Sequence, residues 1–188
     1  MIEPPAADEP RRVIPDSGFA DDDGSVAPAV AAALTAYDAG EATYAETLAV
    51  LQRARLLVPV VAITGEVEPF ETVAAQPPQE PHDERGLAHD KSSDMATVLL
   101  TGRDGRTALL AFTGIGPMRA WDSKARPVPV GTALAARSAA QDGAQALLID
   151  VAGPTSFVIE GDDLSAVAAG WTLAKVGERT AWIRPPTE

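Results

Sequence analysis

The stretch MATVLLTGRDGRTALLAFT, residues 95–113, decides how this chain folds. It contains two apolar runs, 95–100 and 107–113, separated by Gly102-Arg103-Asp104-Gly105. An Asp-Gly pair between two apolar runs is typical of a tight turn, because glycine reaches the positive φ that such turns need. The stretch therefore predicts a β-hairpin with one strand over each run.

Downstream of this hairpin the sequence alternates between strands and helices. Gly114 and Pro117 interrupt the second strand, and a short helix reaching Trp121 is expected to follow. The elements expected after that helix are, in order, an extended segment at 126–130, an alanine-rich helix at 132–141, a buried strand at 146–150, a strand at 156–159, a helix capped by Asp162 or Asp163 and running to Ala169, and a strand or packed C-terminal arm at 171–183.

Upstream of the hairpin we expect two helices and a strand. Apolar residues at helical spacing over 26–39 predict the first helix, and Thr43 and Glu46 form a capping-box pattern that opens the second. Together they predict a helical hairpin over the sheet. Residues 56–61 read as a strand, and because Pro59 has no N–H, that strand is expected at a sheet edge or with a bulge. The fold class indicated is α+β, a single mixed β-sheet with helices packed on it.

The acidity of the chain is concentrated in two segments. Residues 1–25 contain seven acidic and two basic residues, and residues 63–94 contain eight and two. The rest contains twelve and eleven, and is therefore almost neutral. Like charges keep a segment solvated and extended, so we predict a disordered acidic tail at 1–25 and a flexible acidic loop at 63–93. Residues 26–188 would then form one domain.

Composition excludes several functional classes. The 188 residues contain no cysteine, which removes thiolate nucleophiles and cysteine-based zinc sites and favours a reducing, cytoplasmic location. The N-terminus lacks the pattern of a secretory signal, and no apolar run approaches the roughly 18 residues of a membrane span. A net charge of −12 leaves no excess of Lys and Arg for phosphates, so we expect neither a nucleic-acid nor a membrane partner.

Several stretches in a fixed order resemble one protein family. They are Leu56-Leu57-Val58-Pro59-Val60, Ser93-Asp94-Met95-Ala96, Asp104-Gly105-Arg106, Ala111-Phe112-Thr113, Trp121, Ala125-Arg126-Pro127-Val128-Pro129, Leu148-Ile149-Asp150 and Gly153-Pro154. Their succession resembles the SseB-type domain, the N-terminal domain of proteins whose name refers to enhanced serine sensitivity, in its single-domain actinobacterial form. The resemblance covers roughly residues 43–160. It implies a fold and brings no catalytic residues with it.

A basic and aromatic segment, residues 103–126, suggests a binding surface. It has a local charge of +3 and contains Trp121, and tryptophan and arginine are the residues that most often anchor protein interfaces. The interaction surface expected from it comprises Arg103, Arg106, Arg119, Trp121 and Arg126. The other interpretation is structural, with Trp121 in the core and the arginines paired to Asp122 and Asp150.

A cleft beside Asp150 is the alternative site. Asp150 follows a predicted buried strand, and the carboxyl ends of strands often line clefts in α/β sheets. Asp150 and Arg126 would then bind a small ligand or act as an enzyme site, with the 63–93 loop as a lid. An Arg126–Asp150 ion pair would serve equally well as a structural link.

Other chemical motifs are weak. The only histidines, His82 and His89, lie in the acidic loop, which makes solvated residues a better reading than a metal site. Gly114 and Gly116 do not form a dinucleotide fingerprint, because Arg119 occupies the place of the third glycine. We therefore expect no metal and no cofactor.

The sequence as a whole favours a non-enzymatic binding or regulatory module that acts on an unknown protein partner or small ligand. No serine or carboxylate has an evident activating base beside it. The alternatives are a small-ligand binder or small enzyme at the Asp150 cleft, and a scaffold. The sequence does not define an oligomeric state.

Overall fold

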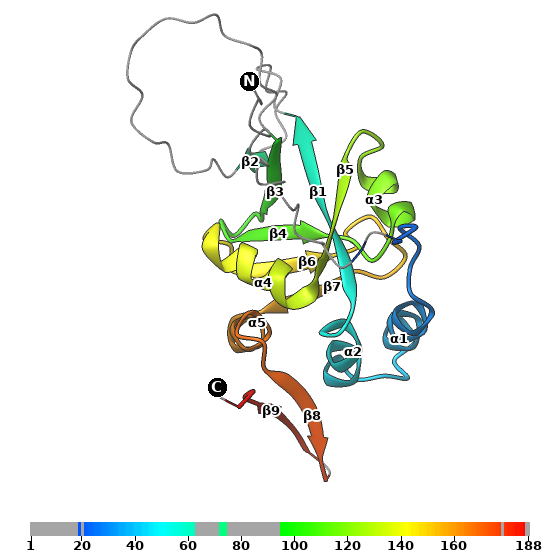
Figure 1. The fold of residues 1–188 in the computed structure, drawn as a ribbon, viewed down its shortest axis with the longest axis vertical. Helices are drawn as coiled ribbons and strands as arrows, with labels where there is room; N and C mark the ends of the chain where they lie inside the picture. The colour runs from blue at the N-terminus through cyan, green and yellow to red at the C-terminus, as the bar shows by residue number, and fades with distance from the viewer. Residues whose placement is uncertain (1–18, 20, 63–71, 75–94, 178, 187–188) are drawn as a thin grey trace, which may run out of the picture.

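The computed structural model describes residues 19, 21–62, 72–74, 95–177 and 179–186 of the 188-residue chain (Figure 1). The helices it contains are α1 (Pro28–Asp38), α2 (Tyr44–Leu51), α3 (Ile115–Trp121), α4 (Thr132–Gln141) and α5 (Gly161–Ala168). The strands are β1 (Arg55–Ala62), β2 (Thr72–Ala74), β3 (Met95–Thr101), β4 (Thr107–Ala111), β5 (Arg126–Gly131), β6 (Ala146–Ile149), β7 (Phe157–Glu160), β8 (Thr172–Val176) and β9 (Arg179–Ile183). The α+β class expected from the sequence is confirmed.

Seven of the strands form one mixed sheet. Its order is β5-β1-β3-β4-β6-β7, and β2 pairs with β3 beside this path. β4 and β6 run parallel, while the other described pairs are antiparallel. A crossover that contains α3, β5 and α4 connects the parallel pair, as a parallel connection requires.

The hairpin predicted from residues 95–113 is formed by β3 and β4. Leu99 lies opposite Leu109, and the turn between the strands is closed by Gly102 N–H donating to Arg106 O at 2.7 Å. Gly105 has a φ of 81°, the left-handed conformation expected for the glycine of this turn.

The edge position predicted for β1 is wrong. β1 pairs with β5 along one side and with β3 along the other. Leu57 exchanges two backbone hydrogen bonds with Phe112, and from Val60 onward the neighbour on that side is β3. Pro59 lies where the neighbour changes, so its missing N–H removes no ladder bond from an otherwise internal strand.

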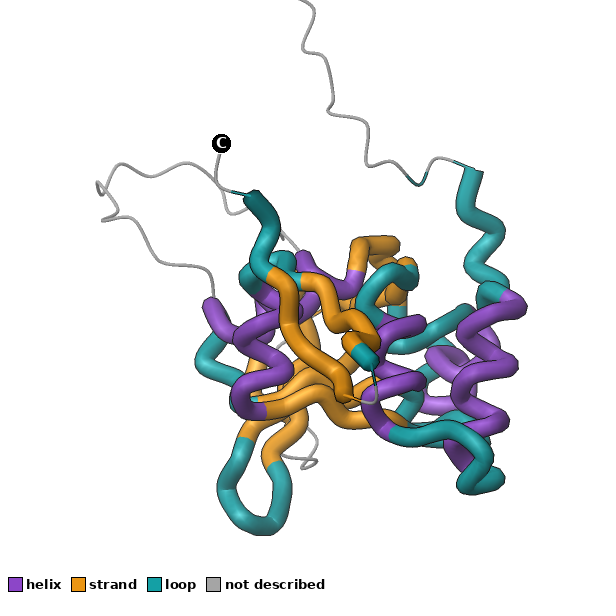
Figure 2. The backbone as a smooth tube through the Cα atoms, turned by 90° about the horizontal axis from the view of Figure 1, so that it is seen from below, coloured by secondary structure: helices purple, strands orange, loops and turns teal. Residues whose placement is uncertain are grey.

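The sheet has two apolar faces with unequal cover. One carries Leu56, Leu109, Leu147 and Phe157 under residues of α1, α2, α4 and α5. The other carries Leu57, Val98, Leu110 and Phe112, and the helix packed against it is α3. Figure 2, seen from below, shows helices flanking the strands. Beyond α3 the second face is more open to solvent, because Leu100 and Leu148 are half-buried and Val158 is 39% exposed.

Residues 21–26 pack against the sheet, although the sequence placed 21–25 in the tail. Asp22 pairs with Arg55 of β1, and Ile115 N–H donates to Gly24 O at 2.8 Å. The helical hairpin of α1 and α2 follows, and the capping box at Thr43 and Glu46 is confirmed by reciprocal hydrogen bonds. Of the predicted 63–93 loop, the structure describes β2, and the rest lies outside the described residues.

The predicted C-terminal arm is a separate two-stranded sheet, β8–β9, which extends away from the body (Figure 1). The Gln52 side chain links it to α2, because its Oε1 accepts from Leu173 N–H at 2.9 Å and its Nε2 donates to Leu173 O at 3.1 Å. This side-chain amide takes the place of a neighbouring strand. The predicted cap of α5 differs, since Glu160 occupies the N-cap and neither Asp162 nor Asp163 caps it.

Candidate functional site

Trp121 lies at the end of α3, at the edge of the core. Its ring packs on Phe112 with a centroid distance of 5.7 Å, and it is half-buried. Arg119, two positions earlier on the same helix, is exposed. Residues two apart on a helix do not share a face, so Arg119 and Trp121 point in different directions.

Arg126 belongs to the opposite face of the sheet. Residues directly opposite each other in an antiparallel pair share a face, and Arg126 lies opposite Val60. Pro127, one position later, lies opposite Pro59 and shares the face of Leu57 and α3. The exposed Arg126 side chain is therefore directed away from Trp121.

Arg103 and Arg106 lie in the turn before β4, whereas α3 follows β4. The five residues of β4 span roughly 16 Å, so the two arginines and Trp121 lie at opposite ends of the strand. The structure does not bring the five predicted surface residues together. They were close in sequence, but strand direction and strand alternation separate them.

Asp150 is a buried structural carboxylate. It is 2% exposed, and it accepts from Thr113 N–H at 2.8 Å and from the Thr113 hydroxyl at 2.5 Å. Its φ of 54° is left-handed, which aspartate tolerates better than most residues. Burial raises the pKa of the Asp150 carboxyl, while the hydrogen bonds from Thr113 act in the opposite direction.

The predicted partnership of Asp150 with Arg126 is not formed. No ion pair joins them within the described part of the chain, and Asp150 lines neither the two hollows described below nor the pocket beside α5. Both Asp150 oxygens accept from Thr113, and the residue is 2% exposed, so little of the carboxylate is accessible to a ligand. The turn after it is also tight, because a Cβ at Gly153 would lie 3.0 Å from Asp150 Cβ.

A half-buried charge, Arg55, extends this network. Arg55 donates to Thr113 O at 2.9 Å and pairs through Nε with Asp22 Oδ2 at 2.6 Å. Its Nη2 also donates to Ser25 O at 2.6 Å. Thr113 thus connects the ends of β4 and β6 to β1 and the N-terminal segment. Sequence reasoning missed Asp22 and Arg55. The one feature that could have pointed to this pair is that Arg55 is the single charged residue at the start of an otherwise apolar strand.

Arg106 is the predicted surface residue that borders a pocket. Its Nη1 donates to Glu160 Oε2 at 2.8 Å, and its Nε donates to Asp104 Oδ2 at 2.6 Å. The Arg106 side chain is 62% exposed. We call the Arg106–Glu160 pair the ridge, because it separates two hollows at this end of the sheet.

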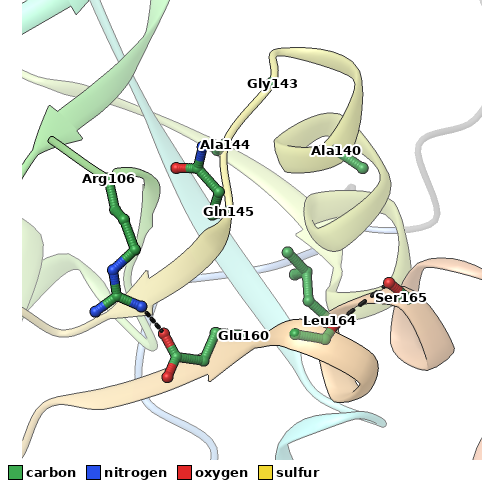
Figure 3. A pocket seen from close by; sticks show the side chains of 9 residues that line it. Arg106, Ala140, Gly143, Ala144, Gln145, Glu160, Leu164 and Ser165 are labelled. Carbon is green, nitrogen blue, oxygen red and sulfur yellow. Dashed lines mark hydrogen bonds and ion pairs between the residues drawn. The ribbon is translucent and has the colours of Figure 1, made fainter.

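The first hollow, about 670 Å³, lies between the ridge and the facing ends of α4 and α5 (Figure 3). Figure 3 shows Arg106 and Glu160 on one side, and Leu164 and Ser165 on the other. Gln145 borders it as well, and its Oε1 accepts from Thr107 N–H at 2.7 Å.

The second hollow, about 260 Å³, opens on the less covered face of the sheet. Its floor comes from four neighbouring strands, through Leu100, Ala108, Leu148 and Val158. Val158 is 39% exposed and lies on the edge strand β7. An apolar floor with one ion pair at its rim can hold an apolar group and orient it by hydrogen bonds.

Glu160 and Gln145 were missed by sequence reasoning. Glu160 is the last residue of an alternating strand and Gln145 precedes a buried one, and polar residues at strand ends are usually solvated. Only the pairing of β6 with β7, which sets Glu160 opposite Ala146, places Glu160 near the turn of Arg106.

His82 and His89 lie outside the described residues, and within them no group of three or more His, Cys, Asp or Glu could hold a metal ion. None of the described helices is long and apolar enough to cross a bilayer.

Comparison with known proteins gives one match. The family model of the SseB protein N-terminal domain matches residues 30–166, from α1 to within α5. No curated protein and no solved structure matches the chain. The matched stretch contains the whole seven-stranded sheet, and it is most of the chain. The chain therefore belongs to the SseB family.

Proposed function

We propose that this chain is a non-enzymatic, cytoplasmic binding module of the single-domain SseB type, and that its binding surface is the ridge with its two hollows. The observation that carries the proposal is that both hollows share Arg106, Gln145 and Glu160. One bound segment can therefore contact both hollows across a single ion pair.

The hydrogen-bonding groups of the ridge support this proposal. Arg106 has five N–H donors, and within the described residues only those on Nε and Nη1 have protein acceptors. The Gln145 amide nitrogen likewise has no acceptor there. These donors suit the backbone carbonyls of an extended polypeptide.

The two edges of the sheet differ in a way that favours a partner at β7. Leu57 directs its backbone groups toward Phe112, so alternation directs those of Pro127 and Pro129 to the free side of β5. Proline has no N–H, so these positions cannot donate to an added strand. The edge strand β7, Phe157–Glu160, contains no proline.

The partner we propose is a polypeptide segment that pairs with β7 in extended form. It places an apolar side chain in the second hollow and accepts a hydrogen bond from Arg106. Strand addition of this kind obtains affinity from main-chain hydrogen bonds and specificity from pockets for alternate side chains.

A photo-crosslinking residue at Val158 tests the proposal, with Val128 as the matched control. Both are exposed valines on edge strands, at 39% and 40%. In lysate of the source organism we expect one polypeptide to be captured from Val158 and not from Val128. Arg106→Gln should reduce that capture about tenfold, because a hydrogen bond to a charged group is lost.

Two outcomes would contradict the proposal. Equal capture from Val128 and Val158 would mean that neither edge is selective. Capture that is unchanged by Arg106→Gln, in a variant with a native circular dichroism spectrum, would remove the ridge from the interface. A small molecule that raises the melting temperature, without any crosslinked polypeptide, would favour a ligand-binding protein instead.

A further inference from the structure

A third pocket, of about 350 Å³, lies between α5 and the β8–β9 hairpin. Asp162, Ser165 and Ala166 line it from α5, and Trp171, immediately before β8, and Trp182 of β9 line it from the other side. The hairpin follows residue 166, where the family match ends. This pocket is therefore built partly from elements outside the matched domain, and it shares no residue with the ridge.

The hairpin presents one of its faces to the body. Leu173 and Trp182 are opposite each other in the β8–β9 register, and Leu173 is 7% exposed. Trp182 Nε1 donates to Asp163 Oδ1 at 2.9 Å, which fixes the orientation of this indole. Strand alternation puts Trp171 and Arg184 on the same face as this pair.

A guanidinium group already lies on one of the two indoles. The Arg184 guanidinium carbon is 4.9 Å from the centre of the Trp171 ring. That distance is within the range of a cation–π interaction, in which the negative face of the ring attracts the cation. Arg184 is exposed and makes no ion pair within the described residues, so this contact is open to competition.

The charge around the pocket favours a cation. Asp162 and Asp163 lie in the first turn of α5, and the Arg184 guanidinium lies on the Trp171 ring. The Asp163 carboxylate is held by Trp182, whereas the exposed Asp162 lines the pocket and has no ion-pair partner among the described side chains. Two half-buried indoles and a free carboxylate are the groups that recognise guanidinium and ammonium ligands.

We propose that this pocket binds an arginine side chain of a partner polypeptide, and that Arg184 competes for the same site. A polypeptide is favoured over free arginine because the pocket lining contains no cationic side chain that would pair with an α-carboxylate. The proposal does not depend on the function assigned to the ridge.

The experiment uses the indole N–H signals of the three tryptophans in the full chain, followed by two-dimensional NMR. The probe is Nα-acetyl-arginine amide, and the control is its neutral isostere Nα-acetyl-citrulline amide. In Arg184→Gln we expect the arginine probe to shift the Trp171 and Trp182 signals saturably, while Trp121 on the far side of the core stays unshifted. The citrulline control should shift none of them.

Two variants and a third compound sharpen the result. The wild-type chain should bind the arginine probe about two- to fivefold more weakly than Arg184→Gln, because its own guanidinium occupies the ring. Asp162→Asn in the Arg184→Gln background should weaken binding about two- to fivefold. Free L-arginine should bind no more tightly than the blocked residue.

The proposal is overturned by equal shifts with citrulline, by shifts at Trp121 as large as those at Trp171, or by binding that Arg184→Gln does not strengthen. Tighter binding of free L-arginine would overturn the assignment to a polypeptide side chain. None of these outcomes bears on crosslinking at Val158, so the two proposals fail separately.

Discussion

Asp150 provides the sharpest test of the structural interpretation, because three substitutions separate its three properties. Asp150→Ala removes the acceptor for the buried Thr113 N–H, at a cost of about 1–3 kcal/mol, and the acceptor for the hydroxyl, at about 1 kcal/mol. It also places a Cβ-bearing residue without a polar side chain at a φ of 54°, which costs roughly another 1 kcal/mol. We therefore expect a loss of about 3–5 kcal/mol in the free energy of unfolding.

Asp150→Asn and Asp150→Gly complete the series. The asparagine Oδ1 can accept from Thr113 N–H while its Nδ2 donates to the hydroxyl, and asparagine tolerates left-handed φ, so the expected cost is about 0–1 kcal/mol. Asp150→Gly loses both bonds but relieves the backbone, and it should be about 1 kcal/mol less damaging than Asp150→Ala. Urea denaturation followed by far-ultraviolet circular dichroism measures all three.

The outcome of this series also shows which property of Asp150 the fold needs, its charge or its hydrogen bonds to Thr113. If Asp150→Asn is as destabilising as Asp150→Ala, the fold needs the negative charge itself. That result would support the ion pair with Arg126 that the sequence suggested. If Asp150→Ala costs less than 1 kcal/mol, the bonds to Thr113 do not hold the strand ends together.

The pH dependence of stability follows from the direction of the Asp150 pKa. Burial raises the folded-state pKa above the unfolded value of about 3.9. The folded protein then holds this proton more tightly, so its contribution to stability is present below the unfolded pKa and is lost as pH rises through the folded pKa. As the pH rises from the unfolded to the folded pKa, the wild type should therefore lose stability relative to Asp150→Asn. Above the folded pKa, the difference in the free energy of unfolding between the two proteins should stay constant. A wild type that gains stability relative to Asp150→Asn as the pH rises through that window would contradict the sign.

Two further predictions concern the N-terminal segment. Asp22→Ala should lower the free energy of unfolding by about 1–3 kcal/mol, because it leaves the Arg55 guanidinium, only 14% exposed, without its carboxylate partner. Urea denaturation measures this change, and a loss below about 0.5 kcal/mol would show that residues 21–26 do not hold this charge. Gly114→Ala should lower the free energy of unfolding by about 1–3 kcal/mol, because the new Cβ would lie 2.7 Å from Val26 Cγ2. The control is Gly116→Ala, which should cost nothing because no atom lies within 4 Å of its new Cβ. Equal melting temperatures for the two variants would contradict the docked position of the N-terminal segment.

The secondary structure of this chain is determined largely by neighbouring residues in the sequence, and it could therefore be predicted. The turn at Asp104-Gly105 closes the expected hairpin, and the capping box at Thr43 begins α2 where the pattern places it. These signals depend on residues within a few positions of each other, which is why the sequence alone contains them. The C-terminal turn at Gly177, with a φ of 62°, has the same local origin, but residues 171–183 were predicted only as a strand or packed arm, without this turn.

The candidate site could not be predicted in the same way. Five residues within 103–126 were expected to form one surface, yet Arg126 lies on the opposite face of the sheet from Trp121 and Arg106 lies at the other end of β4. Side-chain direction in a strand changes at every residue, so a one-residue uncertainty in register decides the face. The partner of Arg106, Glu160, is 54 residues away in the sequence, and no local pattern connects them.

For the segment Arg126-Pro127-Val128-Pro129, the conformation was predicted from the sequence, but its role in the fold was not. Its extended form was expected, and β5 confirms it, but the segment was assigned a role only through Arg126, as part of a binding surface. In the sheet its prolines remove two of the N–H donors that would point away from β1, at positions 127 and 129, so they protect much of a free edge from pairing with another chain. A protected edge at β5 makes the proline-free edge at β7 the more informative one. It is the edge beside which the apolar floor of Leu148 and Val158 lies open, and to which Arg106 is tied through Glu160.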